Sequence, residues 1–126
     1  MELITEYIEA VNEIERIHNL ELADKKSVRK SNKLANRIRT IATEINRYYP
    51  ELKEEFYQLL FHESERVRIW AAHHILEVME YENVYRKNAL KEVRRVAKKD
   101  KSVEGLGNEM WLQEWYKNHP KDRLLF

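Results

Sequence analysis

The chain contains no cysteine, and only two glycines and two prolines occur among its 126 residues. The absence of cysteine excludes disulfide bonds and thiolate metal sites, and it fits a reducing compartment. So few helix-breaking residues, with 36% of all residues charged, favour an all-helical protein. No apolar run approaches the roughly 18 residues that a membrane-spanning helix needs. Since the first residues also lack the basic start of a signal peptide, we expect a cytoplasmic protein without membrane contact.

The motifs of common catalytic and nucleotide-binding sites are absent as well. The sequence has no G-x-S-x-G, no P-loop and no G-x-G-x-x-G. His73 and His74 are adjacent, so on a helix they point about 100° apart and cannot bind one metal ion together. These absences predict a protein that is not an enzyme and holds neither a metal ion nor a cofactor.

Apolar residues recur at helical spacing along most of the chain, and six helices can be read from them. They run over about residues 2–18, from capping residues 24–27 to Tyr49, from Pro50 through Leu60, from the N-cap Ser64 to about Met79, over about 82–99, and from the N-cap Ser102 to about Asn118. Residues 1–120 are predicted to form one helical-repeat domain. Residues 121–126 are predicted to be a frayed tail, although Leu124, Leu125 and Phe126 could dock on the last helix.

Residues 61–79 are the most informative segment for the fold. A short polar turn there is followed by small and aliphatic residues over a wide arc of the expected helix, which must therefore touch more than one neighbour. A weak repeat at an offset of 36 residues aligns Val67 with Val103 and Leu76 with Leu112. Two helices per repeat of this length are typical of helical solenoids. The prediction is an all-α, short right-handed α–α superhelix (HEAT/armadillo-like) of about six helices in three antiparallel pairs; an ordinary helical bundle is the alternative.

The same segment predicts a candidate partner-binding patch. Trp70 and His73 lie on the narrow polar arc of the expected helix, where an exposed tryptophan is unusual. The 36-residue offset places His73 beside Glu109, so the two could form a hydrogen bond. The predicted concave patch consists of Trp70, His73, Glu77, Glu109 and Gln113. The alternative is that Trp70 packs locally and that His73 and Glu109 form a structural pair.

Arg68 and the basic residues of the helix over 82–99 lead to two further predictions. Arg68 lies inside the apolar arc, and we expect a structural salt bridge to the preceding turn, with Glu63 or Glu104 as its partner. The helix over 82–99 has a basic face that could follow a phosphate backbone: Lys87, Lys91, Arg94, Arg95 and Lys98. This helix lacks the interleaved exposed aromatic residues of many nucleic-acid modules, so nucleic acid ranks behind a protein partner.

Three motifs carry a resemblance to a known family: Val67 to Leu76 (VRIWAAHHIL), Gly105 to Gly107 (GLG), and Glu109 to Trp115 (EMWLQEW). Asn32 matches a fourth position. The chain resembles small bacterial proteins catalogued as a domain of unknown function, number twenty-nineteen, whose two glycines are further apart. The resemblance covers about residues 25–118 and implies HEAT/armadillo-like helices. Such proteins are similar to immunity proteins encoded beside secreted bacterial toxins.

The functional hypothesis from the sequence is a non-enzymatic protein-binding module. Its most specific form is an immunity protein that neutralises a cognate bacterial toxin encoded nearby, acting as a monomer or weak dimer. The alternatives are a nucleic-acid-binding helical-repeat protein that uses the basic face over 82–99, and a homo-oligomeric scaffold.

Overall fold

The structure is a computed structural model that describes residues 2–21, 23–99 and 103–124. These residues form seven α-helices, two short 3-10 helices and no strand, which confirms the all-α class. The α-helices are α1 (Glu2–Asn19), α2 (Lys25–Tyr48), α3 (Lys53–Tyr57), α4 (Glu65–Glu77), α5 (Asn83–Lys99), α6 (Val103–Asn118) and α7 (Pro120–Leu124). The 3-10 helices are η1 (Pro50–Leu52) and η2 (Gln58–Phe61). Within this part of the chain every helix is too short or too polar to cross a membrane.

The predicted capping residues begin two of the helices. The Asp24 carboxylate accepts a hydrogen bond from the backbone N–H of Ser27, and the Ser64 hydroxyl accepts one from Val67. Each cap satisfies a backbone donor that the first turn of a helix leaves without a partner. The predicted cap at Ser102 lies outside the described residues.

The segment after Pro50 differs from the single helix predicted there. It is divided into η1, α3 and η2, and α3 itself has only five residues. Phe56, Leu59 and Leu60 are all buried. A tightened 3-10 turn rotates successive side chains by more than an α-helical turn does, which brings residues toward the core that a straight α-helix would point elsewhere.

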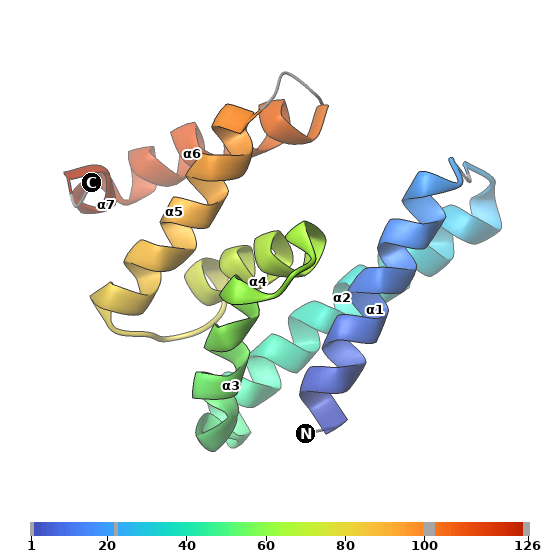
Figure 1. Cartoon of the computed structure of the whole chain (residues 1–126), viewed down its shortest axis with the longest axis horizontal. Helices are drawn as coiled ribbons and strands as arrows, with labels where there is room; N and C mark the ends of the chain where they lie inside the picture. The colour runs from blue at the N-terminus through green and yellow to red at the C-terminus, as the bar shows by residue number, and fades with distance from the viewer. Residues whose placement is uncertain (1, 22, 100–102, 125–126) are drawn as a thin grey trace.

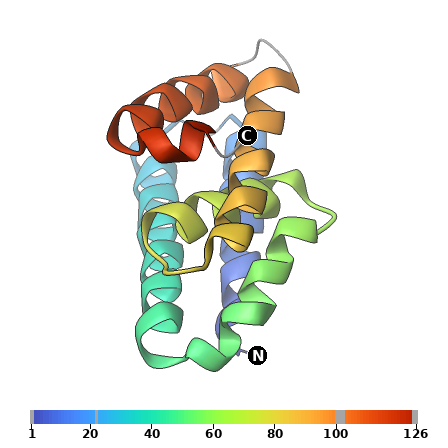
Figure 2. The ribbon, with the colours of Figure 1, turned by 90° about the vertical axis from the view of Figure 1, so that its left-hand side faces the viewer.

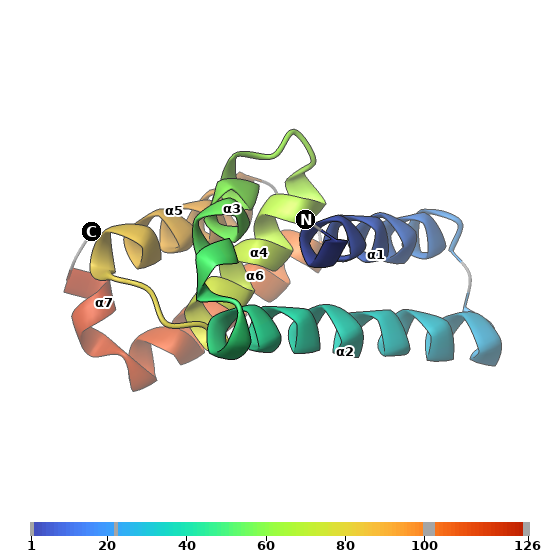
Figure 3. The same cartoon turned by 90° about the horizontal axis from the view of Figure 1, so that it is seen from below.

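Helix α4 is the centre of the arrangement. Figure 1 shows α1 and α2 side by side at one end of the long axis and α5 with α6 at the other, with α4 between the two pairs. Figures 2 and 3 show α1, α3 and α5 on one side and α2, α6 and α7 on the other, with α4 crossing between them. The predicted handedness and superhelical winding remain predictions.

The core follows from the position of α4. Buried aliphatic residues of α4, such as Val67 and Ile75, join those of α1, α2 and α5 in one cluster. Tyr7 of α1 lies at the centre, in edge-to-face contact with Phe56 and with its hydroxyl oxygen 2.6 Å from His74 Nδ1. The exposures of Val67 and Val103 break the proposed repeat: Val67 is fully buried, whereas Val103 is 90% exposed. Val103 begins α6 in the pair of helices at one end of the molecule, whereas α4 has neighbours on both sides.

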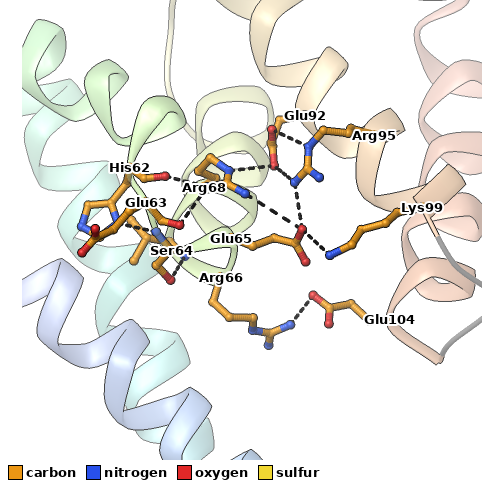
Figure 4. Close-up of polar contacts among 11 residues, drawn as sticks. His62, Glu63, Ser64, Glu65, Arg66, Arg68, Glu92, Arg95, Lys99 and Glu104 are labelled. Carbon is orange, nitrogen blue, oxygen red and sulfur yellow. Dashed lines mark hydrogen bonds and ion pairs between the residues drawn. The ribbon is translucent and has the colours of Figure 1, made fainter.

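A cluster of charged residues joins the start of α4 to α5 (Figure 4). The Arg68 guanidinium donates to the carbonyl oxygens of His62 and Glu63, at 2.7 and 3.1 Å, and to the Glu92 carboxylate at 3.3 Å. Arg68 therefore holds the preceding turn, as predicted, but it contacts the backbone of Glu63 rather than its carboxylate. Glu104, the other predicted partner, is paired with Arg66 instead.

The last described residues are a docked helix, so the predicted frayed tail is wrong for residues 121–124. Asp122 of α7 is only 4% exposed and accepts hydrogen bonds from Arg86 at 2.6 Å and from the Trp115 indole at 2.9 Å. A buried carboxylate requires such partners, and they fix α7 against α5 and α6. The side chains of Leu124, Leu125 and Phe126, for which docking was the alternative, lie outside the described residues.

Candidate functional site

Two of the five predicted patch residues, His73 and Glu77, form a junction among three helices. Glu77 Oε1 lies 3.2 Å from Arg39 Nη1 of α2, and Oε2 accepts a hydrogen bond of 3.0 Å from the Trp111 indole of α6. Glu77 Oε2 also lies 3.5 Å from His73 Nδ1, a close approach without hydrogen-bond geometry. The carboxylate thus connects α4 to α2 and α6.

His73 is joined to Asn108 rather than to Glu109, so the predicted His73–Glu109 contact is wrong. His73 Nε2 lies 2.8 Å from Asn108 Oδ1, and the amide nitrogen of Asn108 donates to the Glu104 carbonyl. Because that nitrogen is already committed, Nε2 is the donor to Oδ1. At His73 the facing residue is therefore 35 positions later rather than 36, and one residue on a helix turns a side chain by about 100°.

Trp70 supports the core rather than a free surface. Its ring packs against His74 with centroids 5.8 Å apart, and His74 in turn reaches Tyr7. Burial lowers the pKa of His74 to about 4. The local-packing alternative is therefore the one that the structure supports for Trp70.

A row of aromatic rings continues from the junction along α6. The His73 and Trp111 rings meet edge to face at 4.4 Å, Trp111 stacks on Trp115 at 4.9 Å, and Trp115 stacks on His119 at 3.8 Å. The Trp115 indole ends on Asp122 of α7. The 36-residue offset did not reveal this row, although the spacing of Trp111, Trp115 and His119 by four residues is a helical stripe visible in the sequence.

The junction has the chemistry of a structural site. The adjacent His73 imidazole, then Arg39 and Trp111, hold the pKa of Glu77 at about 2 against the opposing effect of burial. A carboxylate so strongly stabilised as an anion is a poor general base at neutral pH. The described residues also contain no group of three His, Asp or Glu side chains that could hold a metal ion.

The other two patch residues, Glu109 and Gln113, line a separate hollow of about 680 Å³ between α5 and α6. Four cationic side chains surround it, and Glu109 is the one acidic residue in its lining. The lining residues are Arg94, Lys98, Glu109, Leu112, Gln113, Tyr116, Lys117 and Arg123. Gln113 donates to Glu109 at 3.4 Å, and the Arg123 guanidinium lies 5.8 Å from the centre of the Tyr116 ring. We refer to this site as the α5–α6 hollow.

The predicted basic face of α5 is divided between two surroundings. Arg94 and Lys98 line the α5–α6 hollow, whereas Arg95 pairs with Glu65 and Glu92 in the cluster of Figure 4. Lys87 and Lys91 are exposed elsewhere along the helix. Adjacent helical residues such as Arg94 and Arg95 point about 100° apart, which explains why the five cations do not act as one surface.

Exposed apolar residues on α6 adjoin the helical face that carries Glu109 and Gln113. Leu106 and Met110 are 59% and 63% exposed, and with Val103 they recur at a spacing of three and four residues. Gly107 lies among them, and a Cβ added there would meet nothing within 4 Å. Close approach within the chain therefore does not require a glycine at this position. The two halves of the predicted patch thus belong to different sites: a structural junction, and a cationic hollow beside an apolar stripe.

Comparison of the chain with protein-family models, with curated proteins and with solved structures finds no match. The family resemblance carried by the motifs around Val67 and Glu109 therefore stays a prediction.

Proposed function

We propose that the protein is a non-enzymatic protein-binding module whose partner places an acidic segment in the α5–α6 hollow. The observation that carries the proposal is the composition of this hollow, where four cations surround Leu112 and Tyr116 with Glu109 as the one acidic residue. Cationic side chains attract a carboxylate-bearing partner and orient it.

The apolar stripe of α6 supports a protein as the partner. Protein interfaces combine a desolvated apolar centre with a polar rim, and their binding energy is concentrated in a few anchors. Leu106 and Met110 offer such anchors, and the Tyr116 ring adds an aromatic one. All three residues lie on α6. Trp111 and Asn108 hold this helix against α4, so binding requires little further ordering of the chain.

The more specific proposal is that the partner is a toxin domain encoded nearby and that this protein is its immunity protein. This step depends on the family resemblance. A rigid and charged helical surface suits an inhibitor that blocks its target rather than transforming it.

The test is coexpression with the product of the neighbouring gene. The neighbour alone should stop cell growth, and coexpression of this protein should restore it. The double substitution Lys98→Glu and Lys117→Glu should abolish the rescue, because it places acidic groups where the partner is acidic. The matched control is Arg29→Glu with Lys33→Glu, which changes the net charge equally on α2. Equal loss of rescue by both pairs, or a harmless neighbour, would contradict the proposal.

The exposed stripe of α6 also favours a second candidate, a homo-oligomer. Light scattering would then give a multiple of the 15.4 kDa chain mass, and Met110→Lys would restore the single-chain mass. A single-chain mass at all concentrations removes this candidate and leaves the stripe to another protein.

A further inference from the structure

The sequence of α2 has an excess of basic residues over most of its length. Between residues 25 and 43 the sequence contains seven basic residues and no acidic one. The basic residues are Lys25, Lys26, Arg29, Lys30, Lys33, Arg37 and Arg39. A net chain charge of only +1 means that this excess is local.

Some of these basic side chains form ion pairs within the protein, and the others remain available to a ligand. Arg37 pairs with Glu6 and Glu44, and Arg39 pairs with Glu77. Lys30 has an exposed pair with Glu13 at 3.3 Å, which contributes little stability. Lys26, Arg29 and Lys33 are exposed and form no ion pair with the described residues.

These available cations gather around one concave surface. A shallow hollow of about 500 Å³ is lined by Lys26, Arg29, Lys30, Asn32, Lys33 and Asn36. Ten residues of helix extend for about 15 Å, so the row is straight and long enough to follow several phosphates. Figure 3 shows that the N-terminal half of α2 extends beyond α4, with α1 as its neighbour. All six lining residues are exposed, so the face that carries the hollow is open to a large ligand.

The lining distinguishes the ligand class. Every one of the six side chains is a cation or an amide, and none is apolar or aromatic. A protein partner would need an apolar anchor at the centre of its site, as the α5–α6 hollow offers with Leu112 and Tyr116. A nucleic-acid backbone needs only cations and hydrogen-bond donors, which lysine, arginine and asparagine supply.

We propose that this face of α2 binds the phosphate backbone of a nucleic-acid duplex without reading its sequence. Its ligand and its place on the molecule differ from those of the proposed protein partner. Each strand of duplex DNA carries one phosphate per about 3.4 Å of axis, so a row of about 15 Å faces roughly four phosphates of one strand. Four lining cations should release about four counterions when they bind.

Fluorescence anisotropy with a labelled 20-base-pair DNA duplex tests the proposal. The logarithm of the association constant should fall with the logarithm of salt concentration with a slope of about −3 to −4. Binding should therefore weaken on the order of 100-fold between 50 and 200 mM salt. The triple substitution Lys26→Gln, Arg29→Gln and Lys33→Gln should reduce the slope to about −1, since each lost phosphate contact removes about 1. All three residues are exposed, so circular dichroism should show an unchanged fold.

The matched control is Lys91→Gln, Lys98→Gln and Lys117→Gln, which removes the same charge from the other end of the molecule. It should keep the wild-type slope. Equal loss in both triple variants would show that net charge alone attracts the duplex, and this would overturn the proposal. Absence of binding in 20 mM salt would overturn it too. Displacement of the duplex by polyglutamate at equal charge concentration would also overturn it, because the site would then prefer an acidic polypeptide to a phosphate backbone. Two residues of the control variant, Lys98 and Lys117, line the α5–α6 hollow. A control variant that binds DNA normally but no longer binds the protein partner would separate the DNA proposal from the proposed function.

Discussion

The Trp111 indole donates a hydrogen bond of 3.0 Å to the Glu77 carboxylate, 34 residues earlier in the chain. The other carboxylate oxygen of Glu77 faces Arg39, so one side chain connects α6 and α2 through α4. Glu77 is the last residue of α4, the position where a helix dipole disfavours an anion. The Trp111 and Arg39 contacts oppose that effect, which makes their loss measurable.

Glu77→Gln should lower the free energy of unfolding by about 1–3 kcal/mol at neutral pH, because it replaces a carboxylate that accepts a hydrogen bond from Trp111 and faces Arg39 with a neutral amide. The matched control Glu109→Gln changes an exposed carboxylate and should alter stability by less than about 0.5 kcal/mol. Urea denaturation of the two variants and the wild type gives both numbers. Equal losses would show that the junction contributes nothing beyond a surface charge.

The pH dependence of that difference follows from the pKa of Glu77. Its folded pKa is about 2, below the ordinary value of 4.5, so the native state holds the proton less readily than the unfolded state. The stabilisation is therefore complete above about pH 4.5 and declines as the pH falls toward 2. The gap in unfolding free energy between wild type and Glu77→Gln should shrink over this window. A constant gap from pH 6 to pH 2.5 would contradict the lowered pKa.

Tyr7→Phe should lower the free energy of unfolding by about 1–3 kcal/mol, since it leaves the buried Nδ1 of His74 without its partner. The control Tyr48→Phe removes a hydroxyl from a side chain that is 65% exposed and should cost little. Thermal or urea unfolding of the two variants separates the outcomes. A negligible effect of Tyr7→Phe would mean that the contact adds nothing to stability.

His74 should also make stability depend on pH in a second window. Burial lowers its folded pKa to about 4 from the ordinary 6.5. Between pH 4 and pH 6.5 the imidazole is therefore protonated in the unfolded state and neutral in the native state. Stability should decline as the pH falls from about 6.5 to 4, with no further contribution from His74 below that. NMR titration of the imidazole should give a midpoint near 4. A midpoint near 6.5 would overturn this prediction.

The sequence predicted the helices better than the contacts between them. The Asp24 and Ser64 caps and the stripe of Val67, Ala71 and Ile75 depend on local spacing, which the sequence displays directly. His73 meeting Asn108 instead of Glu109 depends on a one-residue offset between helices that no local pattern determines. The available charge on α2 is hidden in the sequence for a related reason. Arg37 and Arg39 meet carboxylates of α1 and α4, whereas Lys26 and Lys33 do not, and only the packing of the helices decides which cations are paired.

Arg68→Lys should lower the free energy of unfolding by about 1–3 kcal/mol. A lysine cannot reproduce the planar fork that reaches the carbonyls of His62 and Glu63 together with Glu92. The matched substitution Arg95→Lys affects a more exposed side chain of the same cluster and should cost less than about 1 kcal/mol. Urea unfolding at two salt concentrations adds a second comparison, because salt should reduce the Arg95 effect more. A larger loss for Arg95→Lys would reverse the assignment of the two roles.

Asp122→Asn should release α7 from the rest of the protein. The substitution removes the charge that Arg86 contacts at 2.6 Å and weakens the acceptor of the Trp115 indole. Breaking a buried pair usually costs several kcal/mol, but a five-residue helix beyond α6 can move away and return Arg86 to water. The loss should therefore appear locally, as faster amide hydrogen exchange over residues 119–124, while α4 and α5 keep their protection. The control Lys121→Gln changes an exposed residue of α7 and should leave exchange unaltered. Exchange in wild-type α7 at the rate of an unfolded peptide would show that the helix does not dock and that its contacts with Arg86 and Trp115 do not hold it.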